Sequence, residues 1–85
     1  MNWEIVWSEP ANRDMRRLDR EIARRIHQAI TRLATTGQGD VARMRQSEPE
    51  WRLRVGGWRV RFTYDYAARK IYVHRVLPRG RAYRD

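Results

Sequence analysis

The chain has 85 residues, a formal net charge of +9 and no cysteine. A chain of this length buries only roughly 60–65% of its unfolded surface, so we expect one domain, residues 1–85, with a modest core. The lack of cysteine excludes disulfides and thiolate metal sites. No segment approaches the ~18 apolar residues of a membrane span, and the N-terminus lacks the features of a signal peptide. These features predict a cytoplasmic protein with no membrane partner.

The positive charge is concentrated in the last third of the chain. Residues 1–50 carry nine Arg against eight Asp or Glu, whereas residues 51–85 carry nine Arg and one Lys against two Asp. The planar guanidinium of arginine suits bidentate binding of phosphate. This segregation predicts a surface that faces a polyanion. The alternative is a solvated basic face that favours solubility.

The first 40 residues predict one strand followed by two helices. Residues 3–7 alternate between apolar and polar side chains, as a half-buried strand does. Ser8 is the expected N-cap of a first helix, Asp19 caps a second helix, and Gly37 ends it. Apolar side chains recur at helical spacing along both helices and predict their buried faces: Ala11, Met15, Leu18, Ile22, Ile26, Ile30 and Leu33.

The rest of the chain predicts strands. Residues 41–50 are expected to be an extended entry segment, and three β-rich runs follow at 51–55, 58–66 and 70–77. The element order β-α-α-β-β-β predicts an α+β domain in which two helices pack on one face of a small, mainly antiparallel sheet. The helices are expected to cover this face through Ile22, Ile26, Ile30, Trp51, Leu53, Trp58, Val60 and Phe62.

The segment WRLRVGGWRVRF predicts a hairpin with a fixed register. A two-residue Gly56–Gly57 turn pairs Val55 with Trp58. This register places two pairs of like charges opposite each other, at a cost of a few tenths to about 1 kcal/mol per pair. A face kept only for solubility would alternate both signs of charge, so the pattern indicates phosphate binding on the face away from the helices. The arginines of this face are Arg52, Arg54, Arg59 and Arg61.

The third strand and the tail extend the basic face. If Asp65 pairs with Lys70, then His74 lies beside Arg61, either as part of the basic cleft or as an ordinary strand residue. The same register places Arg75 on the inner side of the sheet. The tail after this strand can curl over the basic face, and its combination of arginine and tyrosine is typical of binding to single-stranded nucleic acid. Its candidate residues are Arg79, Arg81 and Tyr83.

RNA cleavage at a 2′-hydroxyl fits this set of residues. The reaction requires removal of a proton, stabilisation of charge on the phosphorane and protonation of the leaving 5′-oxygen. Arginines supply the second function, and His74 or Tyr83 can move protons. The basic region has only Asp65 and Asp85 as carboxylates, and the two histidines are far apart, so we expect no metal and no cofactor.

The chain resembles the RelE/ParE toxin superfamily of type II toxin–antitoxin systems over nearly its whole length. The segments that carry the resemblance are SEPANRDMRRLD, LATTGQGDVARM, the hairpin WRLRVGGWRVRF and the ending RVLPRGRAYR. The RelE-like branch is favoured, which implies a metal-independent, ribosome-dependent mRNA endonuclease that inhibits translation. The resemblance implies catalytic roles for Arg54, Arg59, Arg79 and Tyr83, and RNA or phosphate contacts from Arg52, Arg61 and Arg81. His74 joins these expected contacts through its predicted place beside Arg61 in the strand register.

Within this resemblance, Arg79 acts on the leaving group and phosphate. Arg54 and Arg59 stabilise transition-state charge, and Tyr83 stacks on a base and can transfer a proton. The resemblance also implies a cognate antitoxin, acidic and partly disordered, in a hetero-oligomeric complex. Two alternatives stay open. One is a ParE-like toxin of the same fold that inhibits DNA gyrase without RNase activity, and the other is a plain nucleic-acid-binding module.

Overall fold

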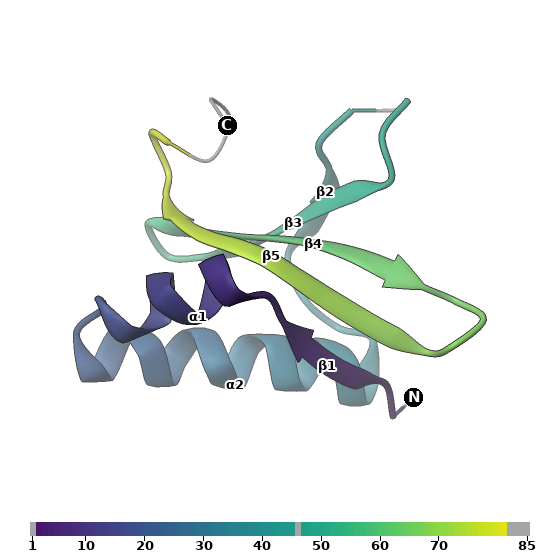
Figure 1. Cartoon of the computed structure of the whole chain (residues 1–85), viewed down its shortest axis with the longest axis horizontal. Helices are drawn as coiled ribbons and strands as arrows, with labels where there is room; N and C mark the ends of the chain where they lie inside the picture. Colours follow the sequence, from purple (N-terminus) through teal and green to yellow (C-terminus); the bar gives the residue numbers. More distant parts are fainter. Residues whose placement is uncertain (1, 46, 82–85) are drawn as a thin grey trace.

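The structure, a computed structural model, describes residues 2–45 and 47–81. Within these residues, two helices lie on one face of a five-stranded sheet, below it in Figure 1. The strand order is β1-β5-β4-β3-β2, with β1 parallel to β5 and the other pairs antiparallel. The predicted α+β fold is confirmed. The elements are β1 (Glu4–Trp7), α1 (Glu9–Arg16), α2 (Arg20–Thr36), β2 (Val41–Arg43), β3 (Glu50–Val55), β4 (Trp58–Asp65) and β5 (Lys70–Pro78).

Strand β2 is an addition to the predicted element order. It lies in the segment expected only to lead into the hairpin, and it pairs with β3 so that Val41 faces Leu53. Three residues are too short for period-two alternation to mark a strand, so the pairing partner defines β2. The pairing brings the loop before β2 alongside the arginine-bearing end of β3, where the Arg54 N–H donates to the Asp40 carbonyl at 2.9 Å.

The predicted helix boundaries follow from local hydrogen bonds. The Ser8 hydroxyl accepts from the Ala11 N–H at 3.1 Å, and the Asp19 carboxylate accepts from the Glu21 N–H at 3.0 Å. Each side chain satisfies a backbone donor that the first turn leaves open. Gly37 ends α2 with φ of 77°, a left-handed conformation that glycine adopts without strain. No helix in residues 2–45 or 47–81 has the length and hydropathy to cross a membrane.

The core lies between the helices and the sheet. Five residues of the predicted buried face are fully buried: Ile26, Ile30, Leu53, Val60 and Phe62. Ile22, Trp51 and Trp58 are partly buried and pack against this core. The apolar side of the hairpin therefore faces the helices, as its alternation predicted. The opposite side of β3 and β4 is left for the polar residues that form the candidate site.

The hairpin has the predicted register. Val55 faces Trp58, Arg54 faces Arg59, and Arg52 faces Arg61. Gly56 has φ of 57°, a conformation that a side chain would strain, so the first glycine of the turn is the one that its backbone requires. Each of these arginines on β3 therefore lies directly opposite an arginine on β4.

The register between β4 and β5 differs from the prediction in one place. Phe62 faces Val73 as expected, but an irregularity follows, and Arg61 pairs with Arg75 instead of lying beside His74. The extra residue on β5 shifts the alternation, so that Val76 faces Val60 and enters the core. The prediction was wrong here because it assumed unbroken pairing along a strand that contains this bulge.

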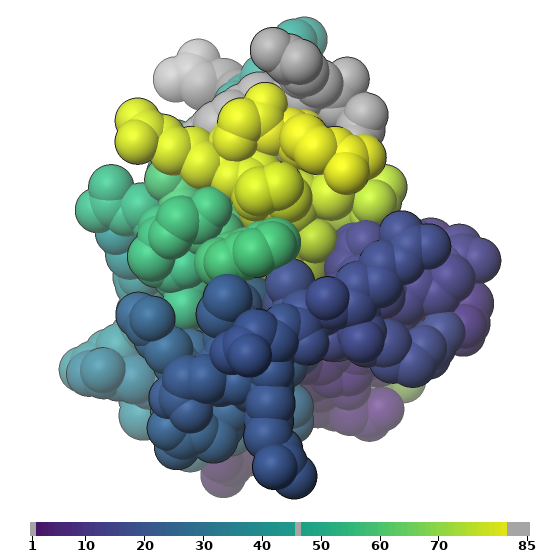
Figure 2. Space-filling view, turned by 90° about the vertical axis from the view of Figure 1, so that its left-hand side faces the viewer, coloured from purple at the N-terminus to yellow at the C-terminus, as the bar shows by residue number. Residues whose placement is uncertain are grey.

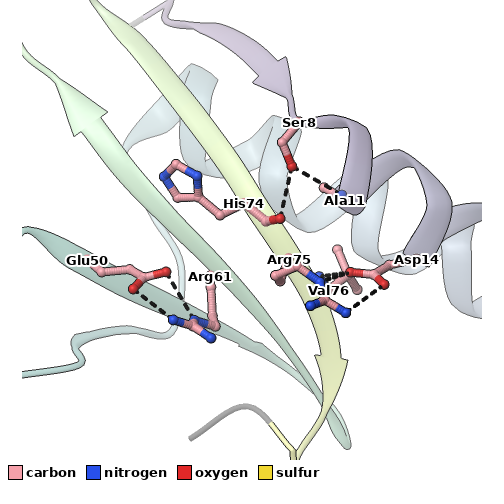
Figure 3. A network of polar contacts seen from close by, with 8 residues as sticks. All are labelled: Ser8, Ala11, Asp14, Glu50, Arg61, His74, Arg75 and Val76. Atoms are coloured by element: carbon pink, nitrogen blue, oxygen red, sulfur yellow. Dashed lines mark hydrogen bonds and ion pairs between the residues drawn. The ribbon is translucent and has the colours of Figure 1, made fainter. Parts of the chain in front are cut away.

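Helix α1 satisfies the backbone around the bulge (Figure 3). The Ser8 hydroxyl donates to the His74 carbonyl at 2.9 Å. Asp14 accepts from the Val76 N–H at 2.8 Å and from the Arg75 guanidinium at 2.9 and 3.2 Å. Arg75, which the predicted register placed on the inner side of the sheet, thus forms an ion pair with a residue of α1. The N-cap residue of α1 and one side chain within the helix thus hold β5 in its shifted register.

Candidate nucleic-acid interface

Four predicted arginines converge on a single pocket of about 300 Å³, which we call the arginine pocket. Its walls come from β3, from β4, from the chain after β5 and from the segment around β2. The Arg79 N–H donates to the Gly57 carbonyl at 2.9 Å, which holds the end of β5 against the hairpin turn. Figure 2 shows this end of β5, in yellow, lying against the green segment of the hairpin. The lining residues are Asp40, Ala42, Arg52, Arg54, Arg59 and Arg79.

Arg59 is the buried member of this pocket, with only 6% of its surface exposed. Its Nη1 atom donates to the carbonyls of Gly56 and Trp58, both at 2.9 Å. These two hydrogen bonds hold the guanidinium against the turn. Their acceptors are backbone carbonyl oxygens and not a carboxylate. Arg59 is therefore a preorganised positive group, whereas Arg79 is exposed at the rim. A fixed charge of this kind stabilises an anion without having to reorganise.

Asp40 is a residue of the pocket that the sequence analysis did not select. Its Oδ2 atom accepts from Arg54 Nε at 2.6 Å, and both side chains are more than half exposed. The carboxylate offsets part of the repulsion expected between facing arginines. Four arginines against one aspartate still leave the arginine pocket strongly positive. Charge counting by segment missed Asp40 because it belongs to the balanced first part of the chain.

A second, larger hollow lies beside the arginine pocket, because Arg61 in one faces Arg52 in the other across the hairpin. Its volume is about 480 Å³, and we call it the mixed hollow. Glu50 binds Arg61 through two hydrogen bonds of 3.0 and 2.9 Å, with the two side chains only 19% and 12% exposed (Figure 3). The lining residues are Glu48, Pro49, Glu50, Arg61, Thr63 and His74.

His74 reaches the mixed hollow from the bulge of β5. Its Nε2 atom lies 2.9 Å from the Thr63 hydroxyl. The structure therefore places His74 and Arg61 on the walls of one hollow, although they are not paired across the strands, and apart from the other predicted arginines. Glu50, like Asp40, was not selected from the sequence. The sequence carried one signal for Glu50. It stands at the start of β3 and alternates with Arg52 and Arg54, so it belongs to the same face of the strand.

The last two predicted residues are not in the arginine pocket of the described structure. Arg81 is exposed and lines a separate pocket of about 250 Å³ with Asp14, Arg17 and Arg75 among its neighbours. Tyr83 lies outside the described residues. In the described part of the chain, the hairpin arginines and Arg79 thus line two hollows together with three carboxylates that were not expected, those of Asp40, Glu48 and Glu50.

The two hollows together offer the groups that phosphodiester chemistry requires. Arginines can bind a phosphate and stabilise added negative charge. A carboxylate and an imidazole, here Glu50 and His74, are side chains that can accept and donate a proton. In residues 2–45 and 47–81, no group of three or more His, Cys, Asp or Glu is arranged to hold a metal ion.

Comparisons with known proteins agree with this architecture. The archaeal RelE–RelB complex from Pyrococcus horikoshii OT3 matches with a TM-score of 0.80 and 20% identity, covering 96% of this chain and all of that one. The RelBE2 toxin–antitoxin complex from Mycobacterium tuberculosis matches with a TM-score of 0.80 and 18% identity, covering 93% of this chain and all of that one. A YoeB/ParE toxin from Agrobacterium tumefaciens gives a TM-score of 0.73 and 16% identity, with 88% and 96% coverage.

These identities are low, so the structural matches establish the fold. No curated protein matches the chain significantly in sequence. A family model described as the ParE toxin of the type II toxin-antitoxin system, parDE, matches residues 5–83. This match spans nearly the whole chain, including the hairpin and the arginines of the pocket. The chain therefore belongs to the ParE toxin family and is a type II toxin with the fold shared by RelE and ParE toxins.

Proposed function

We propose that this toxin is an endoribonuclease that cleaves messenger RNA on the ribosome, without a metal ion, and so inhibits translation in the cytoplasm. The observation that carries the proposal is that the arginine pocket and the mixed hollow, which differ in their side chains, lie next to each other. The arginine pocket can hold the RNA backbone, and the mixed hollow beside it has groups that move protons. A toxin that acted by binding alone would need the arginines but would have no use for this second set.

The reaction uses the nucleophile that RNA itself provides. The 2′-oxygen attacks the adjacent phosphorus, the bond from phosphorus to the 5′-oxygen breaks, and a 2′,3′-cyclic phosphate and a 5′-hydroxyl form. Arg54, Arg59 and Arg79 stabilise the charge on the phosphorane, with Arg52 holding a neighbouring phosphate. Glu50 takes the 2′-hydroxyl proton, and His74 gives a proton to the 5′-oxygen. Stacking of a base on Tyr83 remains a prediction from the resemblance.

A cognate antitoxin is the protein partner that we propose. Two of the similar solved structures are toxins in complex with their antitoxins. The last third of this chain carries most of its net positive charge, which suits an acidic, partly disordered segment laid across the basic face. Such a segment would occupy the same arginines as RNA. The complex would then be hetero-oligomeric, and its dissociation would release the activity.

A second function has one specific observation in its favour. The family model that matches the chain describes ParE toxins, and the resemblance noted from the sequence includes a ParE-like branch that inhibits DNA gyrase without RNase activity. In that case the basic face would bind its target without cleaving RNA. The two functions make opposite predictions for messenger RNA in cells that produce the toxin.

The deciding experiment is to induce the toxin in cells and map the 5′ ends of messenger RNA. The variants are Arg79→Ala, which removes the exposed arginine of the pocket, and Arg20→Ala, which removes an exposed arginine at the start of α2. We expect in-frame cuts within translated codons for the wild type and for Arg20→Ala. The cuts should be lost in Arg79→Ala. Intact messages together with gyrase-linked DNA breaks would reject the RNase and favour the second function.

A further inference from the structure

We propose that Tyr72 is a stacking platform for one nucleobase of the RNA, the base on the 3′ side of the cleaved bond. The inference rests on the proposed function, because it takes RNA as the ligand of the arginine pocket. The ring of Tyr72 has no part in the reaction as proposed. The contact does not distinguish the bases, since every base has a π-face that an aromatic ring can cover.

Tyr72 lies on the face of the sheet that carries the two hollows. Ile71 and Val73, its neighbours on β5, are fully buried, so the alternation of the strand turns Tyr72 to the face away from the helices. Tyr72 pairs with Thr63 of β4. His74 follows two residues later, about 6.6 Å along the strand. Thr63 and His74 both line the mixed hollow, so Tyr72 stands directly beside the wall of this hollow.

The ring of Tyr72 is available to a ligand. Within residues 2–45 and 47–81, Tyr72 contacts no other aromatic ring, its hydroxyl has no hydrogen-bond partner, and it is not among the apolar residues that pack against the core. Tyr64 and Tyr66, by contrast, contact each other and the ring of Trp3. A tyrosine kept for packing would make contacts of that kind, so the ring of Tyr72 points to a ligand.

The charges of the two hollows separate the RNA backbone from this base. The arginine pocket is strongly positive, with four arginines against one carboxylate. Two ion pairs balance the charges around the mixed hollow, Arg61 with Glu50 at 2.9 Å and Arg45 with Glu48 at 3.9 Å. Positive charge therefore decreases from the hairpin turn toward Tyr72, and the phosphates of a bound strand are drawn toward the arginine pocket.

The immediate surroundings of Tyr72 also suit a base and not a phosphate. Its partners in the neighbouring strands are uncharged, Thr63 of β4 and Val6 of β1. Further along the same face, Lys70 is flanked in the neighbouring strands by Glu4 and Asp65, so this end of the sheet has more negative than positive charge. An aromatic ring between a basic site and a weakly acidic edge is typical of a surface on which a base stacks.

The two proton-transfer groups set the direction of the strand (Figure 3). Glu50, on β3, takes the proton of the 2′-hydroxyl, which belongs to the nucleotide before the cut. His74, on β5, serves the 5′-oxygen, which belongs to the nucleotide after it. Since β3 also carries Arg52 and Arg54, the strand before the cut continues into the arginine pocket. The base after the cut lies on the side of β5 and meets the ring of Tyr72.

The test measures the binding of short 2′-O-methyl oligonucleotides, which have no 2′-hydroxyl and cannot be cleaved by this reaction. Three ligands of equal length are compared: one wholly abasic, one with a single base at its 3′ end and one with a single base at its 5′ end. With the base at the 3′ end, the phosphates extend from Tyr72 toward the arginine pocket. Competition with a labelled 2′-O-methyl strand in fluorescence anisotropy gives each affinity.

The proteins compared are the wild type, Tyr72→Phe, Tyr72→Leu and the control Tyr66→Leu. Tyr72→Phe keeps the ring and removes only the hydroxyl. The control makes the same substitution as Tyr72→Leu at a tyrosine that is 67% exposed and lies in the turn after β4, where its ring contacts Trp3. Thermal melting checks that each variant is folded.

We expect the base at the 3′ end to raise the affinity of the wild type about tenfold over the abasic ligand, the effect of one stacked base. The base at the 5′ end should change the affinity little. Tyr72→Phe and Tyr66→Leu should keep the gain, and Tyr72→Leu should lose it, because leucine has no flat π-face. A gain that persists in Tyr72→Leu would overturn the role of Tyr72. Equal gains from the two ends would overturn the assignment to the 3′ side.

The measurement separates a failure of this inference from a failure of the proposed function. If the wild type binds none of the ligands at low salt, RNA is not the ligand of the arginine pocket, and both are rejected. If the three ligands bind equally while messenger RNA is cut in cells, only the stacking platform is rejected. Intact messages in cells would reject the cleavage, and with it the assignment of the base to a cleaved bond.

Discussion

The carboxylate of Asp14 in α1 holds residues 75 and 76 of β5 at once, through the guanidinium of Arg75 and the backbone N–H of Val76. Asp14 is 11% exposed in its side chain and Arg75 is 32% exposed, so the pair is only partly screened by water. It spans 61 residues of sequence and fastens β5 at its bulge, next to His74. The interaction therefore ties α1 to the strand that carries His74.

Asp14→Ala should lower the free energy of unfolding by about 2–3 kcal/mol. The change leaves a half-buried arginine without its carboxylate and removes the acceptor of a backbone N–H. Chemical denaturation measures the loss. Glu9→Ala is the matched control, because its ion pair with Arg16 has side chains 70% and 63% exposed and should contribute little. Equal stability of the two variants would mean that the bulge does not need α1.

Asp40→Asn should strengthen the binding of single-stranded RNA and make it more sensitive to salt. The substitution frees Arg54 from a competing carboxylate and raises the charge of the arginine pocket by one. We expect a salt slope steeper by about one unit or less, measured by fluorescence anisotropy over a range of salt concentrations.

The control for this measurement is Asp19→Asn. It makes the same change of charge at the N-cap of α2, where asparagine caps as well as aspartate does. An Asp40→Asn variant that binds RNA with the affinity and slope of Asp19→Asn would show that Arg54 takes no part in phosphate binding.

Arg59 and Arg79 line the same pocket but should differ in their effect on stability. Arg59→Ala removes a buried side chain that donates to two carbonyls of the hairpin turn, and we expect a loss of about 2 kcal/mol. Arg79→Ala removes an exposed side chain and should change stability by less than about 0.5 kcal/mol. Parallel denaturation of both variants tests this difference. A comparable loss in the two variants would contradict the conclusion that Arg59, and not Arg79, also stabilises the hairpin turn.

The two glycines of the hairpin turn should tolerate alanine unequally. Gly56→Ala places a side chain at φ of 57° and should cost about 1 kcal/mol, whereas Gly57→Ala has no such φ and meets no atom within 4 Å. Thermal unfolding of the two variants provides an internal comparison, because the substitutions are chemically identical and adjacent. Equal melting temperatures would argue against the turn conformation described above.

The features that the sequence predicted well are those set by local rules. The Gly56–Gly57 turn and the alternation of residues on each side fixed the register of β3 and β4. Helix caps at Ser8 and Asp19 were readable because each depends on a few neighbouring residues. The convergence of Arg79 with the hairpin arginines followed from the resemblance to a family, and the pocket that they line agrees with it.

The features that the sequence did not predict depend on contacts between distant segments. Asp40 lies in the arginine pocket because the short β2 pairs with β3. A strand of three residues is too short for a periodic pattern to predict it. The sequence carried one signal for the bulge on β5, because the predicted register placed the charged Arg75 on the inner side of the sheet. A charged residue on the inner side indicates a break in the alternation of the strand, but it does not identify the additional residue of the bulge. Asp14, which pairs with Arg75, lies on another element.

The parallel pairing of β1 with β5 also has a consequence for the order of events during synthesis. Ile5 lies beside Ile71, so the first strand has no partner until most of the chain has left the ribosome. Arg79, the last wall of the arginine pocket in the described chain, is translated later still. Contacts this far apart in sequence form slowly compared with local ones. A chain that ends before β5 therefore lacks both the strand partner of β1 and one wall of the arginine pocket.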